Sequence, residues 1–133
     1  MREHRAQLGD LRVRQLFLAL VKNPVGFTEV LRTILGRDGR RTLLIAINDL
    51  FADGTDVSWL WDVEFERVRG RRVIAAGERA ADLAVRLRYA DVDCDVWDGS
   101  ILDAVARLGA AEVDVVANYT VFADLVRAVG SRT

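Results

Sequence analysis

The chain has 133 residues, of which 51% are hydrophobic, so it fits one domain with a real core and has no room for a second. Nineteen basic and twenty acidic side chains give a formal charge of -1, which excludes general attraction to nucleic acid or anionic lipid. We therefore expect arginines such as Arg71 and Arg72 to lie on solvated faces. The single cysteine excludes internal disulfides, which suits a reducing cytoplasm. No apolar run is long enough to span a bilayer, so we expect a cytoplasmic protein.

Apolar runs of strand length alternate with segments of helical period in the first half of the chain. Residues 1–10 are expected to be a tail or an added remnant, and the domain is expected to occupy residues 11–133. The apolar run 16–23 predicts a strand, which Pro24 and Gly26 end before a helix over 27–35. Two further strands are predicted at 41–48 and 71–77, with the short element WLWDVEFERV between them.

The second half of the chain continues the alternation. We predict a helix over 79–90, a strand over 91–97, a helix over 101–109, a strand over 112–119 and a helix over 121–129. Strict alternation in the fourth strand places Val92, Cys94 and Val96 on one face. Five strands that alternate with helices predict an α/β fold, a Rossmann-like and mostly parallel sheet of about five strands with helices on both faces.

Polar loops follow the strands, at the edge where parallel sheets gather their ligands. Four of them are expected to share one rim, namely 23–27, 48–62, 77–82 and 118–120. A purely structural explanation exists for several of these residues. Asn23 and Asn48 are suited to capping, and Asp82 suits the first turn of a helix, where its charge complements the helix dipole.

The loop 48–62, NDLFADGTDVSWLWD, is longer and more acidic than a simple connection requires. The letters ADG at 52–54 predict a turn with Asp53 and Asp56 on either side of a bend. Such a carboxylate pair could bind Mg²⁺, act as acid and base, or orient a histidine. The chain contains neither a P-loop pattern nor a three-glycine dinucleotide fingerprint, so nucleotide binding by this chain alone is not expected.

Three other residues have both a structural and a functional interpretation. Cys94 is expected to be buried in mid-strand, where a thiol usually acts as a small hydrophobic group. Trp59 and Trp61 are either core residues or anchors for a partner protein, since tryptophan is enriched at binding hot spots.

Four segments together resemble the carboxy-terminal domain of the MurT family, the Mur-ligase-like subunit of lipid II isoglutaminyl synthase. They are KNPVGFTEVLRTIL, NDLFADGTDVSWLWDVEFE, GERAADLAVRLRYA and NYTVFADL. The resemblance extends from about residue 11 to about residue 129, and the pattern N-D-x-x-A-D-G-x-D-x-S-W is its most specific part.

The resemblance implies a partner and a reaction in peptidoglycan biosynthesis. In this family, MurT forms a heterodimer with GatD, a glutamine amidotransferase that releases ammonia from glutamine with its own cysteine and histidine. The ammonia amidates the D-glutamate of the lipid II stem peptide, at the inner face of the membrane, after activation by ATP. The MurT carboxy-terminal domain lends the third member of the triad, the aspartate just before x-S-W, which is Asp56 here.

The family also contains parts that this chain does not have. The resemblance implies that ATP, Mg²⁺ and, in many members, Zn²⁺ belong to the missing MurT domains, and that this chain holds no cofactor or metal. It further implies that the chain alone is inactive within an ATP-dependent amide ligase complex. Since Mur ligase domains close on one another, Asn23, Asn48, Asp49 and Asp53 are candidates for facing the substrate or the central ATP-binding domain.

Two alternatives remain open. The chain could be a non-catalytic Rossmann-like docking module, in which case replacing Asp56 leaves the chemistry of the partner unchanged. It could also be a Mg²⁺-dependent phosphoryl-transfer domain that uses Asp49 and Asp53. Phosphoryl-transfer folds of this kind need a lysine at the end of a particular strand. Lys22 is the only lysine in the sequence and does not lie at such a strand end, which counts against this second alternative.

Overall fold

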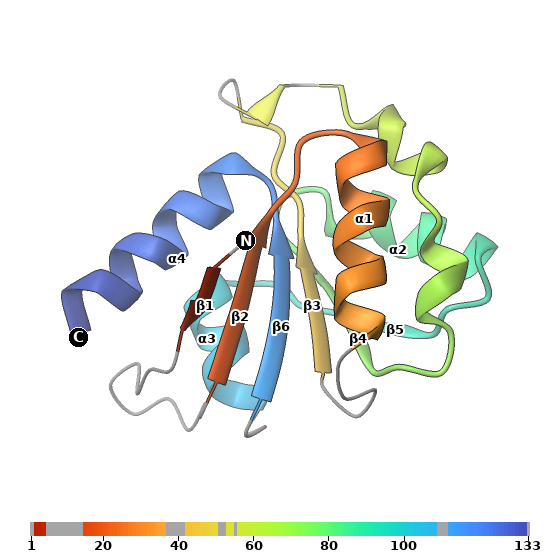
Figure 1. The fold of residues 1–133 in the computed structure, drawn as a ribbon. Coiled ribbons are helices and arrows are strands. Elements are labelled where there is room, and N and C mark those ends of the chain that lie inside the picture. Colours follow the sequence, from red (N-terminus) through yellow and green to blue (C-terminus); the bar gives the residue numbers. More distant parts are fainter. Residues whose placement is uncertain are drawn as a thin grey trace.

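The computed structural model describes residues 2–4, 15–36, 42–50, 53–54, 56–108 and 112–132, which form an α/β fold around one sheet (Figure 1). The strand order is β1-β2-β6-β3-β4-β5. The strands are β1 (Arg2–His4), β2 (Gln15–Leu20), β3 (Thr42–Ala46), β4 (Val73–Ala76), β5 (Cys94–Val96) and β6 (Glu112–Ala117). The five strands β2 to β6 are parallel to one another, which confirms the predicted parallel sheet.

The sixth strand, β1, was not predicted from the sequence. It pairs antiparallel with β2 at the edge of the sheet, with Arg2 opposite Leu18 and His4 opposite Leu16. It lies within the segment expected to be a tail, and the rest of that segment, residue 1 and residues 5–10, lies outside the described residues.

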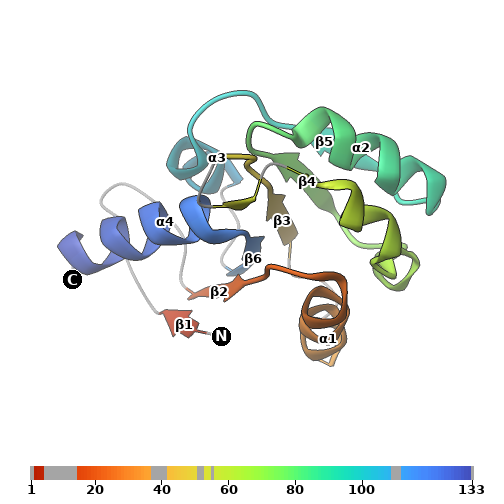
Figure 2. The same ribbon diagram turned by 90° about the horizontal axis from the view of Figure 1, so that it is seen from above.

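Helices cover both faces of the sheet, as the sequence predicts (Figure 2). The helices are α1 (Pro24–Leu35), α2 (Ala80–Tyr89), α3 (Ile101–Leu108) and α4 (Tyr119–Arg132), together with the 3₁₀ helices η2 (Ser58–Asp62) and η3 (Phe65–Val68). One face carries α1, α2, η2 and η3, and the other carries α3 and α4. Right-handed crossovers explain this division, because the connection from β5 back to β6 runs in the opposite direction to the earlier ones. No helix among the described residues combines the length and hydropathy needed to cross a membrane.

The central strand β3 shows why the apolar runs predict strands well. Leu43 and Ile45 pack in the core beneath α1 and α2, whereas Leu44 and Ala46 pack in the core beneath α3 and α4. A strand that is buried on both faces needs an unbroken apolar run. The edge strand β5 is less buried than the inner strands. Val92, which precedes it, packs in the core, but Cys94 begins the strand and is only partly buried, and Val96 is 56% exposed. The expectation that Cys94 is buried in mid-strand is therefore wrong, because β5 has a neighbouring strand on one side only.

Arg71 corrects the expectation that this arginine lies on a solvated face. Its side chain is buried, with Nη2 lying 3.3 Å from Oδ2 of the fully buried Asp114 and Nη1 donating to the carbonyl of Ile34 at 3.4 Å. A buried arginine requires such partners because an uncompensated charge is costly in the interior. The pair therefore joins α1, the segment that leads into β4, and β6 near the amino ends of the strands, while Arg72 is exposed as predicted.

Candidate functional site

Hydrogen bonds join three of the four predicted polar loops at the carboxyl rim of the sheet. The N–H of Asn48 donates to Asn118 Oδ1 at 3.0 Å, and Asn118 Nδ2 donates to the carbonyl of Asn48 at 2.6 Å. The Oδ1 of Asn48 accepts from the N–H of Glu78 at 2.9 Å. The chain leaves β3 toward one face and β6 toward the other, which is the switch point where α/β sheets bind ligands.

Asp53 fastens the acidic loop to the start of α4, an arrangement that we call the Asp53 clamp. Its Oδ1 accepts from the N–H of Thr120 at 2.8 Å, and its Oδ2 accepts from the Thr120 hydroxyl at 2.7 Å and from the N–H of Leu50 at 3.2 Å. The Thr120 hydroxyl also accepts from Asn48 Nδ2 at 3.0 Å. A carboxylate at a helix amino terminus satisfies a free N–H and complements the helix dipole. Asn48 and Asp53 therefore have structural roles.

The remaining strand-end candidates are also engaged in local contacts. Asn23 caps α1, where its Oδ1 accepts from the N–H of Gly26 at 2.8 Å. Asp49 Oδ2 lies 3.5 Å from Arg79 Nη1, and Arg79 Nη2 lies 2.7 Å from Asp82 in the first turn of α2. Within the described ranges, no group of three His, Cys, Asp or Glu side chains is placed to hold a metal ion.

Asp56 differs from these residues because it faces outward. It is exposed, and its Oδ1 accepts from the N–H of Ser58 at 2.9 Å, within its own turn. The backbone N–H of Ser58, followed by its hydroxyl, holds the pKa of the Asp56 carboxyl below its usual value. Gly54, with a φ of 80°, makes the bend that separates Asp56 from Asp53. Asp56 is therefore an ionised carboxylate on an anchored loop.

A small surface cavity of about 260 Å³, the Asp56 hollow, lies beside this carboxylate. Its lining residues are Asp56, Val57, Ser58, Leu60, Trp61, Arg79 and Asp82. Trp61 is 51% exposed there, whereas Trp59 is partly buried, with its ring centroid 6.1 Å from that of Phe27. The two tryptophans thus separate into a core residue, Trp59, and a surface residue, Trp61.

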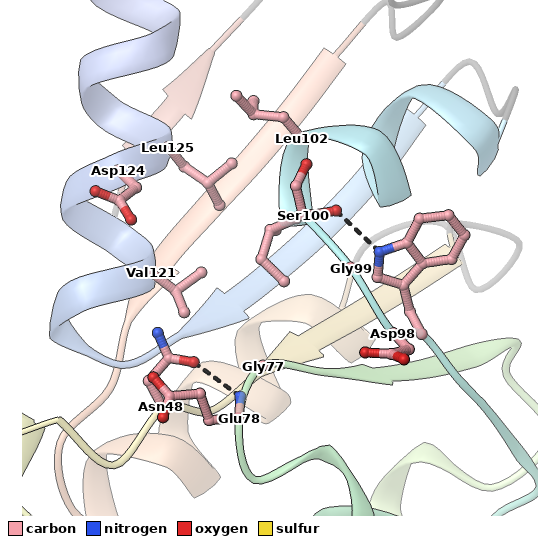
Figure 3. A pocket seen from close by; sticks show the side chains of 12 residues that line it. Asn48, Gly77, Glu78, Asp98, Gly99, Ser100, Leu102, Val121, Asp124 and Leu125 are labelled. Atoms are coloured by element: carbon pink, nitrogen blue, oxygen red, sulfur yellow. Dashed lines mark hydrogen bonds between the residues drawn. The ribbon is translucent and has the colours of Figure 1, made fainter.

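A larger cavity of about 460 Å³ lies between the carboxyl ends of β3 to β5 and the helices α3 and α4 (Figure 3). Val121 and Leu125 from α4 and Ile101 from α3 supply part of its apolar wall. Its charged lining residues are all acidic, namely Glu78, Asp98 and Asp124. Carboxylates repel phosphate, so this lining disfavours nucleotide binding at this place.

Sequence analysis placed Thr120 and Arg79 in loops of this rim but did not identify either as a contact residue. Both belong to loops that were expected there, but their partners, Asp53 and Asp49, are distant in sequence. The available signal was the presence of the polar residues Asn118 and Thr120 directly after the last strand, but this signal does not identify their partners.

The chain matches the family described as MurT ligase C-terminal over residues 20–122. It is 31% identical, over 119 residues, to the MurT subunit of lipid II isoglutaminyl synthase (glutamine-hydrolyzing) of Staphylococcus aureus strain COL, covering 85% of this chain and 27% of that protein. It is 28% identical, over 139 aligned positions, to the subunit of the same name from Streptococcus pneumoniae strain ATCC BAA-255 / R6, covering 98% and 30%. The chain thus spans less than a third of the length of these relatives. The family match covers most of the sequence, so this chain belongs to the MurT ligase C-terminal family.

Proposed function

We propose that this chain is the carboxy-terminal domain of a lipid II isoglutaminyl synthase subunit, and that its Asp56 completes the catalytic triad of a GatD-type glutaminase. The observation that carries the proposal is the state of Asp56, an exposed and ionised carboxylate beside a hollow at the carboxyl rim. The description of the relatives as glutamine-hydrolyzing supports a reaction that starts from glutamine.

In the proposed mechanism, the cysteine thiolate of the partner attacks the amide carbon of glutamine. The partner's histidine takes the thiol proton before this attack and donates it to the departing ammonia, and water then hydrolyses the resulting thioester to release glutamate. Asp56 accepts a hydrogen bond from the other ring N–H of that histidine, which fixes its tautomer and stabilises the imidazolium. Such a carboxylate must be ionised, and the lowered pKa of Asp56 supports this role.

The charges around Asp56 also support this assignment. Arg79 lines the same hollow, but its guanidinium pairs with Asp49 at 3.5 Å and with Asp82 at 2.7 Å. Since those two carboxylates engage Arg79, it competes less strongly with an incoming imidazolium for Asp56.

The proposed division of labour links glutamine hydrolysis to assembly of the complex. Without this chain the glutaminase lacks its carboxylate, so glutamine is spared when no ligase is present to use the ammonia. In the proposal, ammonia then amidates the D-glutamate of lipid II in the ATP-binding domain of the subunit, which would bind the ATP and Mg²⁺ that activate the carboxyl group. We place this reaction at the inner face of the membrane.

The alternative of Mg²⁺-dependent phosphoryl transfer at Asp49 and Asp53 loses support. Both oxygens of Asp53 accept hydrogen bonds from Leu50 or Thr120, and Asp49 is paired with Arg79. The alternative of a purely structural docking module makes a different prediction for Asp56, and the experiment below separates the two.

The test measures the rate of glutamine hydrolysis by the cognate glutaminase with native chain, Asp56→Asn or Asp62→Asn added. Asp62 is a matched control because it is an exposed aspartate at the end of η2, six residues after Asp56. Asp56→Asn should bind the glutaminase but reduce its turnover by up to about 10⁴-fold, the loss seen when a triad aspartate becomes asparagine. Equal stimulation by all three proteins would show that the chain only docks.

A further inference from the structure

Three exposed apolar side chains form a patch next to the Asp56 hollow. Trp61 from η2 and Val85 from α2 are each 51% exposed, and Tyr89 from α2 is 75% exposed. Val85 and Tyr89 are four residues apart on α2 and so lie on one side of it. The rings of Trp61 and Tyr89 meet edge to face, with centroids 5.3 Å apart. We call these three residues the Trp61 patch.

Arg86 holds the patch in a fixed shape from behind. Its Nε donates to the carbonyl of Leu60 at 3.2 Å and its Nη2 to the carbonyl of Val63 at 2.7 Å. Its guanidinium carbon lies 5.5 Å from the centroid of the Trp61 ring. Because Leu60 and Val63 flank Trp61, these bonds tie η2 to α2 before any partner binds. A preorganised aromatic surface pays less conformational entropy on association.

We propose that the Trp61 patch is the main anchor for the glutaminase subunit. The inference rests on the proposed function of Asp56 and deepens it by naming the contact surface. A triad hydrogen bond requires the histidine of the partner within about 3 Å of the Asp56 carboxylate. Since Trp61 and Asp56 line the same hollow of about 260 Å³, a partner that reaches Asp56 also covers Trp61.

The patch continues outward from that point along α2. Asp82 lines the hollow, and Val85 and Tyr89 follow it at three and seven residues, which keeps them on one side of the helix. Seven residues span about 10 Å along a helix, a distance within a standard protein interface. Tryptophan and tyrosine are the residues most enriched among interface hot spots. The partner is therefore expected to present an apolar groove that receives the rings of Trp61 and Tyr89.

The test uses isothermal titration calorimetry to measure the dissociation constant of the complex between the full chain and the purified glutaminase subunit. Tyr89→Ala and Val85→Asp should each raise the dissociation constant by about 30-fold or more, the factor that corresponds to the hot-spot threshold. Tyr119→Ala is the matched control, because Tyr119 is 53% exposed on α4, at the other face of the sheet. It should change the constant by less than about threefold.

The outcomes separate this inference from the role of Asp56. Unchanged dissociation constants for both patch variants, with melting temperatures like the native chain, would overturn the patch as the anchor even if Asp56→Asn abolishes turnover. Raised constants for the patch variants would support it even if Asp56→Asn leaves turnover intact, which would refute the triad instead. If the patch variants change the mass of the chain measured without glutaminase, the patch binds a second copy and the inference fails.

Discussion

The Asp53 clamp makes Thr120→Val the most informative single substitution. Valine has nearly the shape of threonine, so it leaves no cavity and removes only the hydroxyl. That hydroxyl donates to the Asp53 carboxylate at 2.7 Å and accepts from Asn48 at 3.0 Å. A hydrogen bond to a charged group contributes about 1.5–3 kcal/mol and a neutral one about 0.5–1.5 kcal/mol.

All three residues of this network are only partly buried, so water can replace part of what is lost. We therefore expect Thr120→Val to lower the free energy of unfolding by about 2 kcal/mol, near the low end of the combined range. For a domain of 133 residues this corresponds to a fall in melting temperature of about 7 °C. Urea denaturation followed by circular dichroism measures the first quantity, and calorimetry measures the second.

Two further variants make this measurement decisive. Thr120→Ser keeps the hydroxyl and should retain most of the stability. Thr33→Val removes an exposed hydroxyl that bonds only within α1, to the carbonyl of Glu29 at 3.1 Å, and should cost less than about 0.5 kcal/mol. If Thr120→Val unfolds at the same urea concentration as the native chain, or if Thr120→Ser loses as much as it does, the clamp does not stabilise this rim.

Three other substitutions or treatments test separate parts of the structure. Gly77→Ala should lower the free energy of unfolding, measured by urea denaturation, by about 3 kcal/mol or more, because φ is 89° and the new Cβ would lie 2.5 Å from the backbone oxygen of Ile47. Gly70→Ala is its control, since Gly70 has a similar φ but open space around it, and should lower that free energy by only about 1–2 kcal/mol. Asp114→Ala should cost about 3–5 kcal/mol because it removes the buried carboxylate that lies 3.3 Å from the Arg71 guanidinium, and a loss below 1 kcal/mol would contradict that role for the pair. Burial, followed by the charge of a neighbouring aspartate, raises the pKa of Cys94, so its reaction with Ellman's reagent at pH 8 should be slower than that of free cysteine and still accelerate above pH 9. A rate equal to that of free cysteine would show that the thiol is unperturbed.

The sequence predicted the parallel sheet because its information is local. Each inner strand is buried on both faces, so runs such as TLLIAI mark it without reference to the rest of the chain. The strand β1 carries no such mark. It has the sequence REH, and it pairs through backbone hydrogen bonds with β2. An edge strand of this kind leaves no apolar periodicity to detect.

The rim could be predicted only in part for the same reason. Parallel topology alone brings Asn48 and Asn118 together, but it does not say that Asp53 will bond Thr120, which lies 67 residues away. The two tryptophans illustrate a second limit. Trp59 and Trp61 lie in a 3₁₀ helix, in which two residues correspond to a rotation of about 240° around the helix axis. Trp59 therefore enters the core, whereas Trp61 faces solvent. Sequence analysis did not assign these directions, because it did not predict the type of this short element.

Asp53 and Asp56 show how one short loop meets two opposite requirements. A carboxylate that serves a second protein must be accessible, yet it must be held in place before that protein arrives. Asp53 meets the second requirement, because both its oxygens bond to α4 or to the loop itself. Asp56 lies three residues later, past the bend at Gly54, and among the described residues its hydrogen bond is within its own turn, to Ser58. Under the proposed function, the pKa of Asp56, held below the usual value of about 3.9, keeps it ionised from pH 5 upward. The pH dependence of glutamine hydrolysis in that range should therefore come from the cysteine and histidine of the partner, and a lost ionisation in Asp56→Asn between pH 5 and 8 would contradict this assignment.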